Sequence, residues 1–120
     1  MKKLLAIVLL LCSIQAHAFD DWDTTDKRLF VASEALLLAD WMQTRQIVKN
    51  PDKYHETNRI LGEHPSMSSV NMYFASWMVG NYLIADYAGD KYRTAYLTGV
   101  VGVQFIVVRH NALLGLKVAF

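Results

Sequence analysis

Cysteine is almost absent from this sequence, and neither sign of charge is in surplus. Cys12 is the only cysteine, and 12 Lys and Arg residues stand against 11 Asp and Glu residues. Because Cys12 lies in a segment that we expect to be removed, the mature chain has no thiol for a disulfide, a nucleophile or a metal ligand. A chain without surplus positive charge is poorly suited to neutralise phosphates, so the composition argues against nucleic acid as a partner.

The first eighteen residues have the three parts of a secretory signal peptide. Lys2 and Lys3 give a positive start, residues 4–11 form an unbroken apolar run, and Ala16-His17-Ala18 matches a small-x-small cleavage site. We therefore predict export, removal of residues 1–18, and a single mature domain over residues 19–120. Without Lys2 and Lys3, the 12 basic residues fall to ten against 11 acidic ones, so the mature chain is nearly neutral.

The mature sequence predicts an all-α fold. We expect a small bundle of three long hydrophobic helices at about residues 28–49, 68–87 and 91–111, with a polar loop between the first and the second. Pro51 ends the first helix, because proline disfavours the helical state in the residue before it. Ala88-Gly89-Asp90 forms the turn between the second and third helices. We expect the cap of the first helix among three residues, Thr24, Thr25 and Asp26.

The predicted helices have little polar surface with which to face water. Hydrophobic residues make up 53% of the sequence. The second helix has Asp86 as its single acidic residue, and residues 95–108 of the third carry no charge. Since a span needs about twenty apolar residues, both approach that length, whereas Glu34 and Asp40 interrupt the first helix.

The expected location is therefore the bacterial inner membrane, with transmembrane helices in contact with the lipid bilayer. The periplasm is the next candidate, and helical segment lengths argue against the outer membrane. Small residues recur at helical spacing, at Ser76 and Gly80 and again at Ala95, Gly99 and Gly102. That spacing lets helices approach closely, which is compatible with a homo-oligomer or a protein partner and also with an ordinary soluble bundle.

Polar side chains on the first helix are candidates for function. In a bilayer, Glu34 and Asp40 are costly and indicate a functional role, with Arg45 as the nearest cation. Asp40 and Thr44 lie one helical turn apart and share a face. If the helix is soluble, we expect the two carboxylates to face water or the polar groups of a neighbouring helix.

The polar loop, residues 50–69, concentrates metal-ligating and basic groups. A connection of this length in a small domain is more often functional or disordered than idle. His55, Glu56, Asn58 and His64 offer the atoms for a divalent metal or a general base, but their spacing matches no established motif such as His-Glu-x-x-His. Asp40, His55, Glu56 and His64 form a weak candidate metal set, and no other cofactor is indicated. The alternative is a loop that folds back by hydrogen bonds, with a turn at Gly62.

A central block of the sequence resembles a known group of proteins. It consists of Ala39-Asp40-Trp41-Met42-Gln43-Thr44-Arg45, followed by Pro51, Tyr54, Glu56-Thr57-Asn58, Ile60-Leu61-Gly62, His64-Pro65-Ser66 and Val70-Asn71-x-Tyr73-Phe74. The block resembles small uncharacterised envelope proteins of proteobacteria and their phages, over about residues 23–120. The chain departs from that group at Arg59, where proline is common, and at Met42, where glycine is common. The resemblance implies a helical envelope protein and implies no reaction.

We interpret the chain as a small exported helical membrane protein that acts by contact with another cell-envelope component, and the resemblance suggests a phage-type envelope modifier. One alternative is a membrane-associated metal-binding protein or hydrolase that uses the polar cluster of residues 40–66. A second is a periplasmic structural helical module. Because the hydrolase motif Gly-x-Ser-x-Gly is absent, a non-enzymatic role is favoured. The recognition candidates are Glu34, Asp40, Thr44, Arg45, His55, Glu56, Asn58 and His64.

Overall fold

The computed structural model describes residues 2–9, 19 and 21–119, and the fold of this part of the chain is all-α. A short helix covers residues 2–9. It is followed by two long helices, α2 (Thr24–Lys49) and α3 (Met67–Leu113). No strand occurs within the described ranges. The predicted cleavage site after Ala18, together with Cys12, lies outside the described residues.

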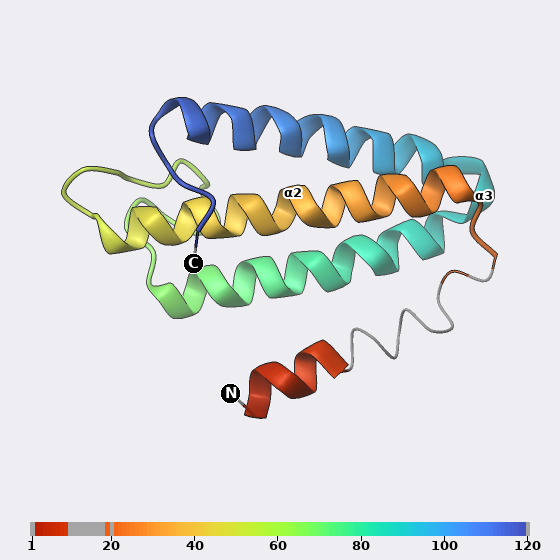
Figure 1. The fold of residues 1–120 in the computed structure, drawn as a ribbon, viewed down its shortest axis with the longest axis horizontal. Helices are drawn as coiled ribbons and strands as arrows, with labels where there is room; N and C mark the ends of the chain where they lie inside the picture. Colours follow the sequence, from red (N-terminus) through yellow and green to blue (C-terminus); the bar gives the residue numbers. More distant parts are fainter. Residues whose placement is uncertain (1, 10–18, 20, 120) are drawn as a thin grey trace.

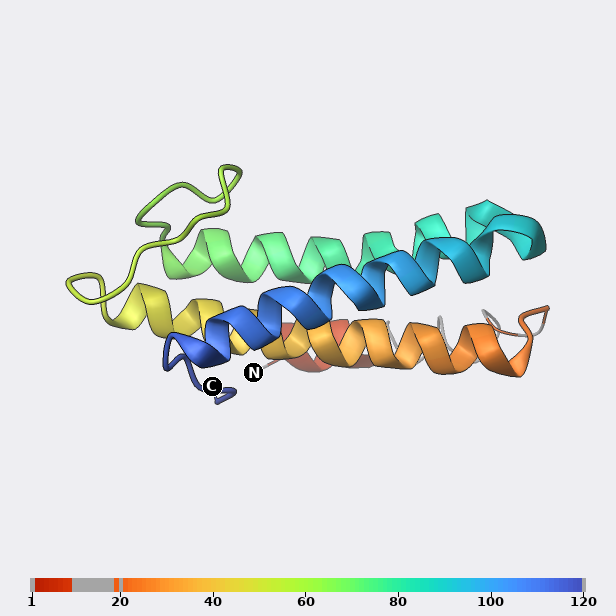
Figure 2. The same ribbon diagram turned by 90° about the horizontal axis from the view of Figure 1, so that it is seen from above.

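Helix α3 folds back on itself at Gly89. This glycine has φ 69° and ψ 175°, a backbone conformation that is left-handed and essentially restricted to glycine. The turn expected at residues 88–90 is therefore present, and it divides α3 into a first arm, residues 67–88, and a second arm, residues 90–113. Both arms run alongside α2, so the bundle consists of three rods (Figures 1 and 2). The loop of residues 50–66 and the chain's C-terminal end lie at the end of the bundle opposite this turn (Figure 1).

The start of α2 differs from the sequence prediction. The helix begins at Thr24 rather than near residue 28, and its N-cap is Asp23 rather than Thr24, Thr25 or Asp26. The Asp23 side chain accepts a hydrogen bond from the Asp26 backbone N–H at 2.8 Å. Asp26 is directed into the bundle and is 2% exposed. A contact made far along the chain therefore places Asp26 inside the first turn and leaves the capping position to Asp23.

Aromatic side chains form the apolar core near the turn end of the bundle. Phe19, Trp22, Phe30 and Tyr82 pack together, with ring centroids of Trp22 and Tyr82 stacked 5.7 Å apart and those of Phe19 and Trp22 edge to face at 4.9 Å. Trp22 and Phe30 are buried with Ala85 and Leu97 of α3. This cluster joins the segment before α2 to both arms of α3.

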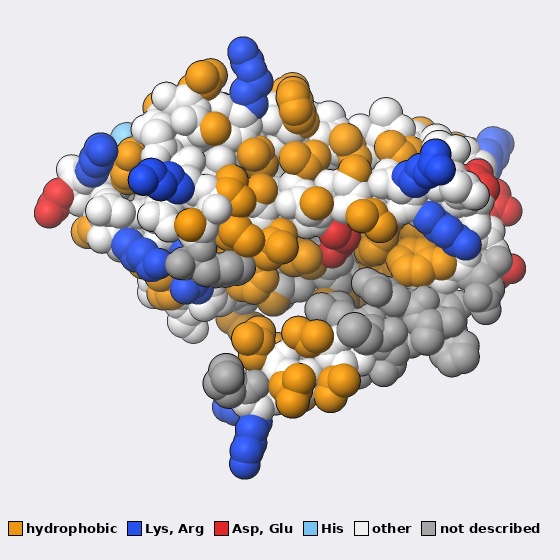
Figure 3. Space-filling view, viewed as in Figure 1, with side chains coloured by type: hydrophobic (Ala, Val, Ile, Leu, Met, Phe, Trp, Pro, Cys, Tyr) orange, Lys and Arg blue, Asp and Glu red, His pale blue; other side chains and the backbone are white. Residues whose placement is uncertain are grey.

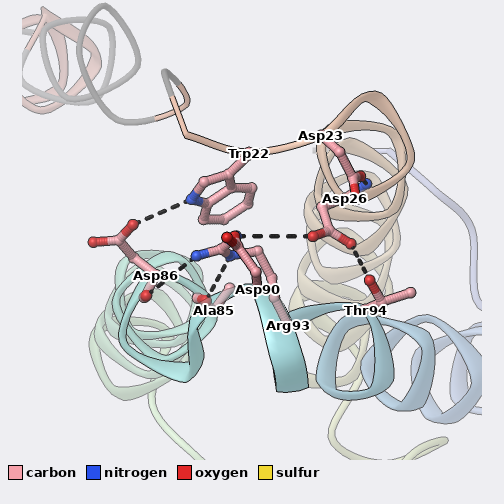
Figure 4. A network of polar contacts seen from close by, with 8 residues as sticks. All are labelled: Trp22, Asp23, Asp26, Ala85, Asp86, Asp90, Arg93 and Thr94. Atoms are coloured by element: carbon pink, nitrogen blue, oxygen red, sulfur yellow. Dashed lines mark hydrogen bonds and ion pairs between the residues drawn. The ribbon is translucent and has the colours of Figure 1, made fainter.

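A buried arginine closes the same end of the bundle (Figure 4). Arg93 donates from Nε to the Ala85 carbonyl at 2.9 Å and from Nη1 to Asp90 at 2.8 Å. The same Nη1 lies 3.8 Å from the carboxylate of Asp26, and the guanidinium lies 4.6 Å from the Trp22 ring centroid. Arg93 thus connects the second arm with the first arm, with α2 and with the segment before it.

The middle of the bundle is joined by an amide rather than by apolar packing. Asn81 is fully buried and donates to Ser33 and Glu34 of α2, each at 2.8 Å. Its Oδ1 accepts a hydrogen bond from the Tyr96 hydroxyl at 3.0 Å. Asn81 therefore links the first arm to α2 and to the second arm.

None of the described helices is long and apolar enough to cross a membrane. This finding differs from the transmembrane helices that the sequence predicts at about residues 68–87 and 91–111. Asn71 and Asn81 interrupt the first arm, and the uncharged part of the second arm is confined to residues 94–108.

Candidate functional site

A pocket of about 430 Å³ lies at the loop end of the bundle, where α2, both arms of α3 and the loop of residues 50–66 meet. Its lining mixes carboxylates, amides and hydroxyls with apolar and aromatic side chains. The lining residues are Asp40, Thr44, Glu56, Thr57, Asn58, Leu61, Tyr73, Phe74, Gln104, Ile106, Val107, His110 and Asn111.

The loop holds its own shape through local hydrogen bonds. The Glu56 backbone N–H donates to the Glu63 carbonyl at 2.8 Å. The Glu56 side chain accepts from the backbone N–H groups of Thr57 and Asn58 at 2.9 and 3.0 Å. Gly62 has φ 81°, so the glycine turn predicted from the sequence is present. The folded-back loop places Glu56 and Asn58 against the helices at the pocket.

Asp40 is the carboxylate that α2 contributes to the pocket, and only 9% of it is exposed. Its Oδ1 accepts hydrogen bonds from Thr44 one turn later, at 3.3 Å, and from Asn111 of the second arm, at 3.2 Å. The shared face predicted for Asp40 and Thr44 is therefore confirmed. Since both printed contacts use Oδ1, the second carboxylate oxygen is left to face the pocket side.

Two carboxyl groups of α2 bind protons more readily than usual. Burial, together with the negative charge of Glu56, raises the pKa of Asp40 to about 6, against the opposing hydrogen bonds from Thr44 and Asn111. Burial raises the pKa of Glu34 to about 7, against the hydrogen bond from Asn81. Glu34 belongs to the polar layer in the middle of the bundle and does not line the pocket.

One polar atom in the pocket wall has no partner. Gln104 lines the pocket, and its Oε1 is buried without a hydrogen-bond donor among the described residues. Gln43 Oε1 is in the same condition next to Thr44, although Gln43 Nε2 donates to the Val108 carbonyl at 3.1 Å. Buried acceptors of this kind are uncommon in folded proteins, and the one on Gln104 faces the space in which a ligand donor can sit.

The structure brings together half of the residues predicted from the sequence. Asp40, Thr44, Glu56 and Asn58 all line the pocket. Arg45 lies nearby on α2 but donates to Asn71 of α3 at 2.9 Å, and Trp41 donates to the same oxygen at 2.9 Å. These two bonds hold α2 against the first arm.

The predicted metal set is not assembled. His55 and His64 are exposed, and neither lines the pocket that holds Asp40 and Glu56. Within the described ranges there is no group of three or more His, Cys, Asp and Glu side chains placed to hold a metal ion. His55 instead lies with Glu56 and Glu63 on a shallow outer surface of the loop.

Sequence reasoning missed the pocket residues supplied by α3. Gln104, His110 and Asn111 come from the second arm, and Tyr73 and Phe74 from the first. Gln104 interrupts the run from Val100 to Val108, which is otherwise apolar apart from Gly102. That single polar residue in an apolar run was the available signal.

None of the protein families, curated proteins or solved structures compared with the chain matches it. The functional argument therefore depends on the chain's own residues and on their arrangement.

Proposed function

We propose that this chain is a small exported helical protein that associates with a bacterial membrane through the apolar outer surface of α3, and that it acts by binding another component of the cell envelope. The observation that supports the proposal is an inverted distribution of side chains. Most folded domains bury apolar groups and expose polar ones, so buried polar residues and large exposed apolar patches are the informative exceptions. Both exceptions occur together in this bundle.

The interior of the bundle is rich in polar groups. Buried polar and charged residues are almost as numerous as buried hydrophobic ones, and they are joined across helices by the hydrogen bonds described above. Such bonds hold helices together where apolar packing against a lipid-like surrounding gives no preference for burial. The buried polar residues are Asp26, Ser33, Asp40, Gln43, Thr44, Asn81 and Arg93.

The outer surface of α3 is apolar. Tyr87, beside the turn, is 94% exposed, and Leu113, at the other end, is 73% exposed. Exposed tyrosines at one end are typical of side chains that sit at a membrane interface. The large exposed hydrophobic residues of α3 are Met72, Leu83, Ile84, Tyr87, Tyr92, Val103, Phe105, Ile106 and Leu113.

Charged groups avoid the same surface. Residues 67–85 and 94–108 of α3 contain no Asp, Glu, Lys or Arg. The charged residues in the matching part of α2, Glu34 and Asp40, hydrogen-bond to α3. On the face in Figure 3, charged side chains gather toward the two ends of the bundle, with hydrophobic side chains over most of the surface between. This arrangement favours contact with lipid over contact with water.

The location and the partner rest on the sequence. The signal peptide predicted at residues 1–18 supports export, and the resemblance of residues 40–74 to envelope proteins supports a role there. Asp40, Thr44, Glu56 and Asn58 mark the pocket as the recognition site for the envelope component. Their separation from the apolar surface of α3 leaves that site accessible when α3 contacts lipid.

Cell fractionation with intact-mass measurement tests this proposal. We expect a product that lacks residues 1–18, sediments with membranes, resists high salt and is released by detergent. Phe105→Glu introduces a charge on the apolar surface and should move protein into the soluble fraction, because removing an apolar side chain from water is worth about 1.5–3 kcal/mol. Ile60→Glu, on the exposed loop, is the matched control and should leave the distribution unchanged. Release of the unmodified product by osmotic shock would contradict the proposal.

A further inference from the structure

The pocket at the loop end collects hydrogen-bond acceptors and negative charge without a cation to match. Asp40 and Glu56 both line it, and the negative charge of Glu56 acts on Asp40. No Lys or Arg is among the lining residues, and His110 is the one basic side chain there. Within the described ranges, ion pairs shorter than 4 Å join Arg93 to Asp26 and Asp90 and involve neither pocket carboxylate.

The third acceptor is the unpartnered oxygen of Gln104. Its Oε1 is buried in the pocket wall and receives no hydrogen bond from a described residue. Leaving such an atom unsatisfied costs on the order of 1–3 kcal/mol, so a ligand that donates to it gains affinity. This neutral amide oxygen comes from the second arm of α3, whereas Asp40 comes from α2 and Glu56 from the loop.

We propose that this pocket binds the primary ammonium group of a small aliphatic molecule. An ammonium group has three N–H donors and one positive charge, which matches the two carboxylates and the amide oxygen. The remaining walls include Leu61, Phe74, Ile106 and Val107, and these suit the alkyl part of such a molecule. This assignment names the ligand class of the recognition site proposed above, and it rests on that proposal for the role of the site.

A bare metal ion fits the same pocket less well. No third His, Cys, Asp or Glu side chain joins Asp40 and Glu56 in a metal-binding group among the described residues. One oxygen of Glu56 already accepts two backbone hydrogen bonds. The volume of about 430 Å³ falls within the range of small-molecule pockets and far exceeds that of one ion.

Calorimetry on the mature protein in detergent tests the assignment with n-butylammonium as the probe. We expect saturable binding at one site. Tetramethylammonium, which carries the same charge but no N–H donor, should not bind. Glu56→Gln keeps an acceptor for the backbone N–H groups of the loop and should weaken binding about tenfold, as expected for loss of a charge-assisted hydrogen bond. Asp40→Asn should weaken it at least as much.

The matched control is Glu63→Gln, which changes an exposed glutamate of the same loop outside the pocket and should leave the affinity unchanged. Equal binding of tetramethylammonium, equal weakening by Glu63→Gln, absence of n-butylammonium binding, or binding of Mg²⁺ or Zn²⁺ alone would each overturn the assignment. Because the measurement is made in detergent, its failure leaves the membrane-association result unaffected.

Lipid nanodiscs then identify the source of the ammonium group. An ethanolamine lipid headgroup would compete with n-butylammonium, so its apparent affinity should be lower in nanodiscs of phosphatidylethanolamine than in those of phosphatidylglycerol. A free amine ligand predicts equal affinity in both. Either pattern supports the ammonium assignment and selects one source.

Discussion

Arg93→Ala should lower the free energy of unfolding by about 3–5 kcal/mol, the range seen when one partner of a buried ion pair is removed. Arg93 is 3% exposed and Asp26 is 2% exposed. The substitution leaves the Asp26 carboxylate buried with Thr94 as its remaining side-chain donor. It also removes donors from the carbonyls of Ala85 and Asp86 and the cation beside the Trp22 ring.

Thermal unfolding of the mature protein in detergent measures the effect. For a domain of about a hundred residues, a loss of this size lowers Tm by roughly 10 °C or more. Lys91→Ala is the control, because Lys91 lies on the same turn and is exposed, so its removal should change stability by less than about 0.5 kcal/mol. Equal Tm values for Arg93→Ala and Lys91→Ala would show that the Arg93 contacts do not hold the turn end together.

The protein should become less stable as the pH rises from about 5 to about 8, since folded-state pKa values raised to about 7 for Glu34 and about 6 for Asp40 lie above the ordinary carboxyl range. A carboxyl with a raised pKa favours the folded state while it is protonated. The stabilisation is complete below the unfolded pKa and is lost as the pH passes through the folded value. The groups that act on these two carboxyls are Asn81 and Tyr96 around Glu34, and Thr44, Glu56, His110 and Asn111 around Asp40.

Melting curves of Glu34→Gln across this pH range isolate the larger of the two shifts. Glutamine keeps the oxygen that accepts from Asn81 and cannot ionise. We expect the variant to exceed the parent protein in stability at about pH 8 by roughly 1–2 kcal/mol, a figure reduced for the partial exposure of Glu34, and to approach it at about pH 5. Glu63→Gln should reproduce the parent's pH dependence. A parent protein whose Tm is flat or rises between these pH values would refute the assignment of Glu34 and Asp40 as buried, proton-binding groups.

The helices were predictable because their signals are local. Apolar runs of helical length, Pro51 at the end of α2 and Gly89 between the arms all act on neighbouring residues. The position of the N-cap was not predictable in the same way. Asp23, Thr24, Thr25 and Asp26 are all capable of capping, and the choice of Asp23 depends on Asp26 meeting Arg93 across the bundle.

About half of the pocket was visible in the sequence. Asp40, Thr44, Glu56 and Asn58 stood out because they are polar residues in or next to one polar loop. Gln104, His110 and Asn111 belong to the same pocket only because α3 turns at Gly89 and brings its second arm back to the loop. His55 and His64 were expected beside Asp40 by chemical type alone, and the loop's own hydrogen bonds leave them exposed.

The inward orientation of polar groups also could not be read from composition. A sequence with 53% hydrophobic residues suggests an apolar interior. Asn81 and Gln43 reach the interior because they find partners on other helices, Ser33 and Glu34 for Asn81 and the Val108 carbonyl for Gln43. Those partners are far away in the sequence, so only the folded arrangement identifies them.

The most direct test of the central claim is whether the outer surface of α3 contacts lipid. Removal of residues 1–18 leaves no cysteine, so a single spin label can be attached at Val103→Cys on that surface, with Ile60→Cys on the loop as the comparison. In lipid vesicles, we expect the label at position 103 to be relaxed more strongly by oxygen than by a water-soluble nickel chelate, and the label at position 60 to show the reverse. A label at position 103 that responds to the nickel chelate as strongly as the label at position 60 would place α3 in water and contradict membrane association.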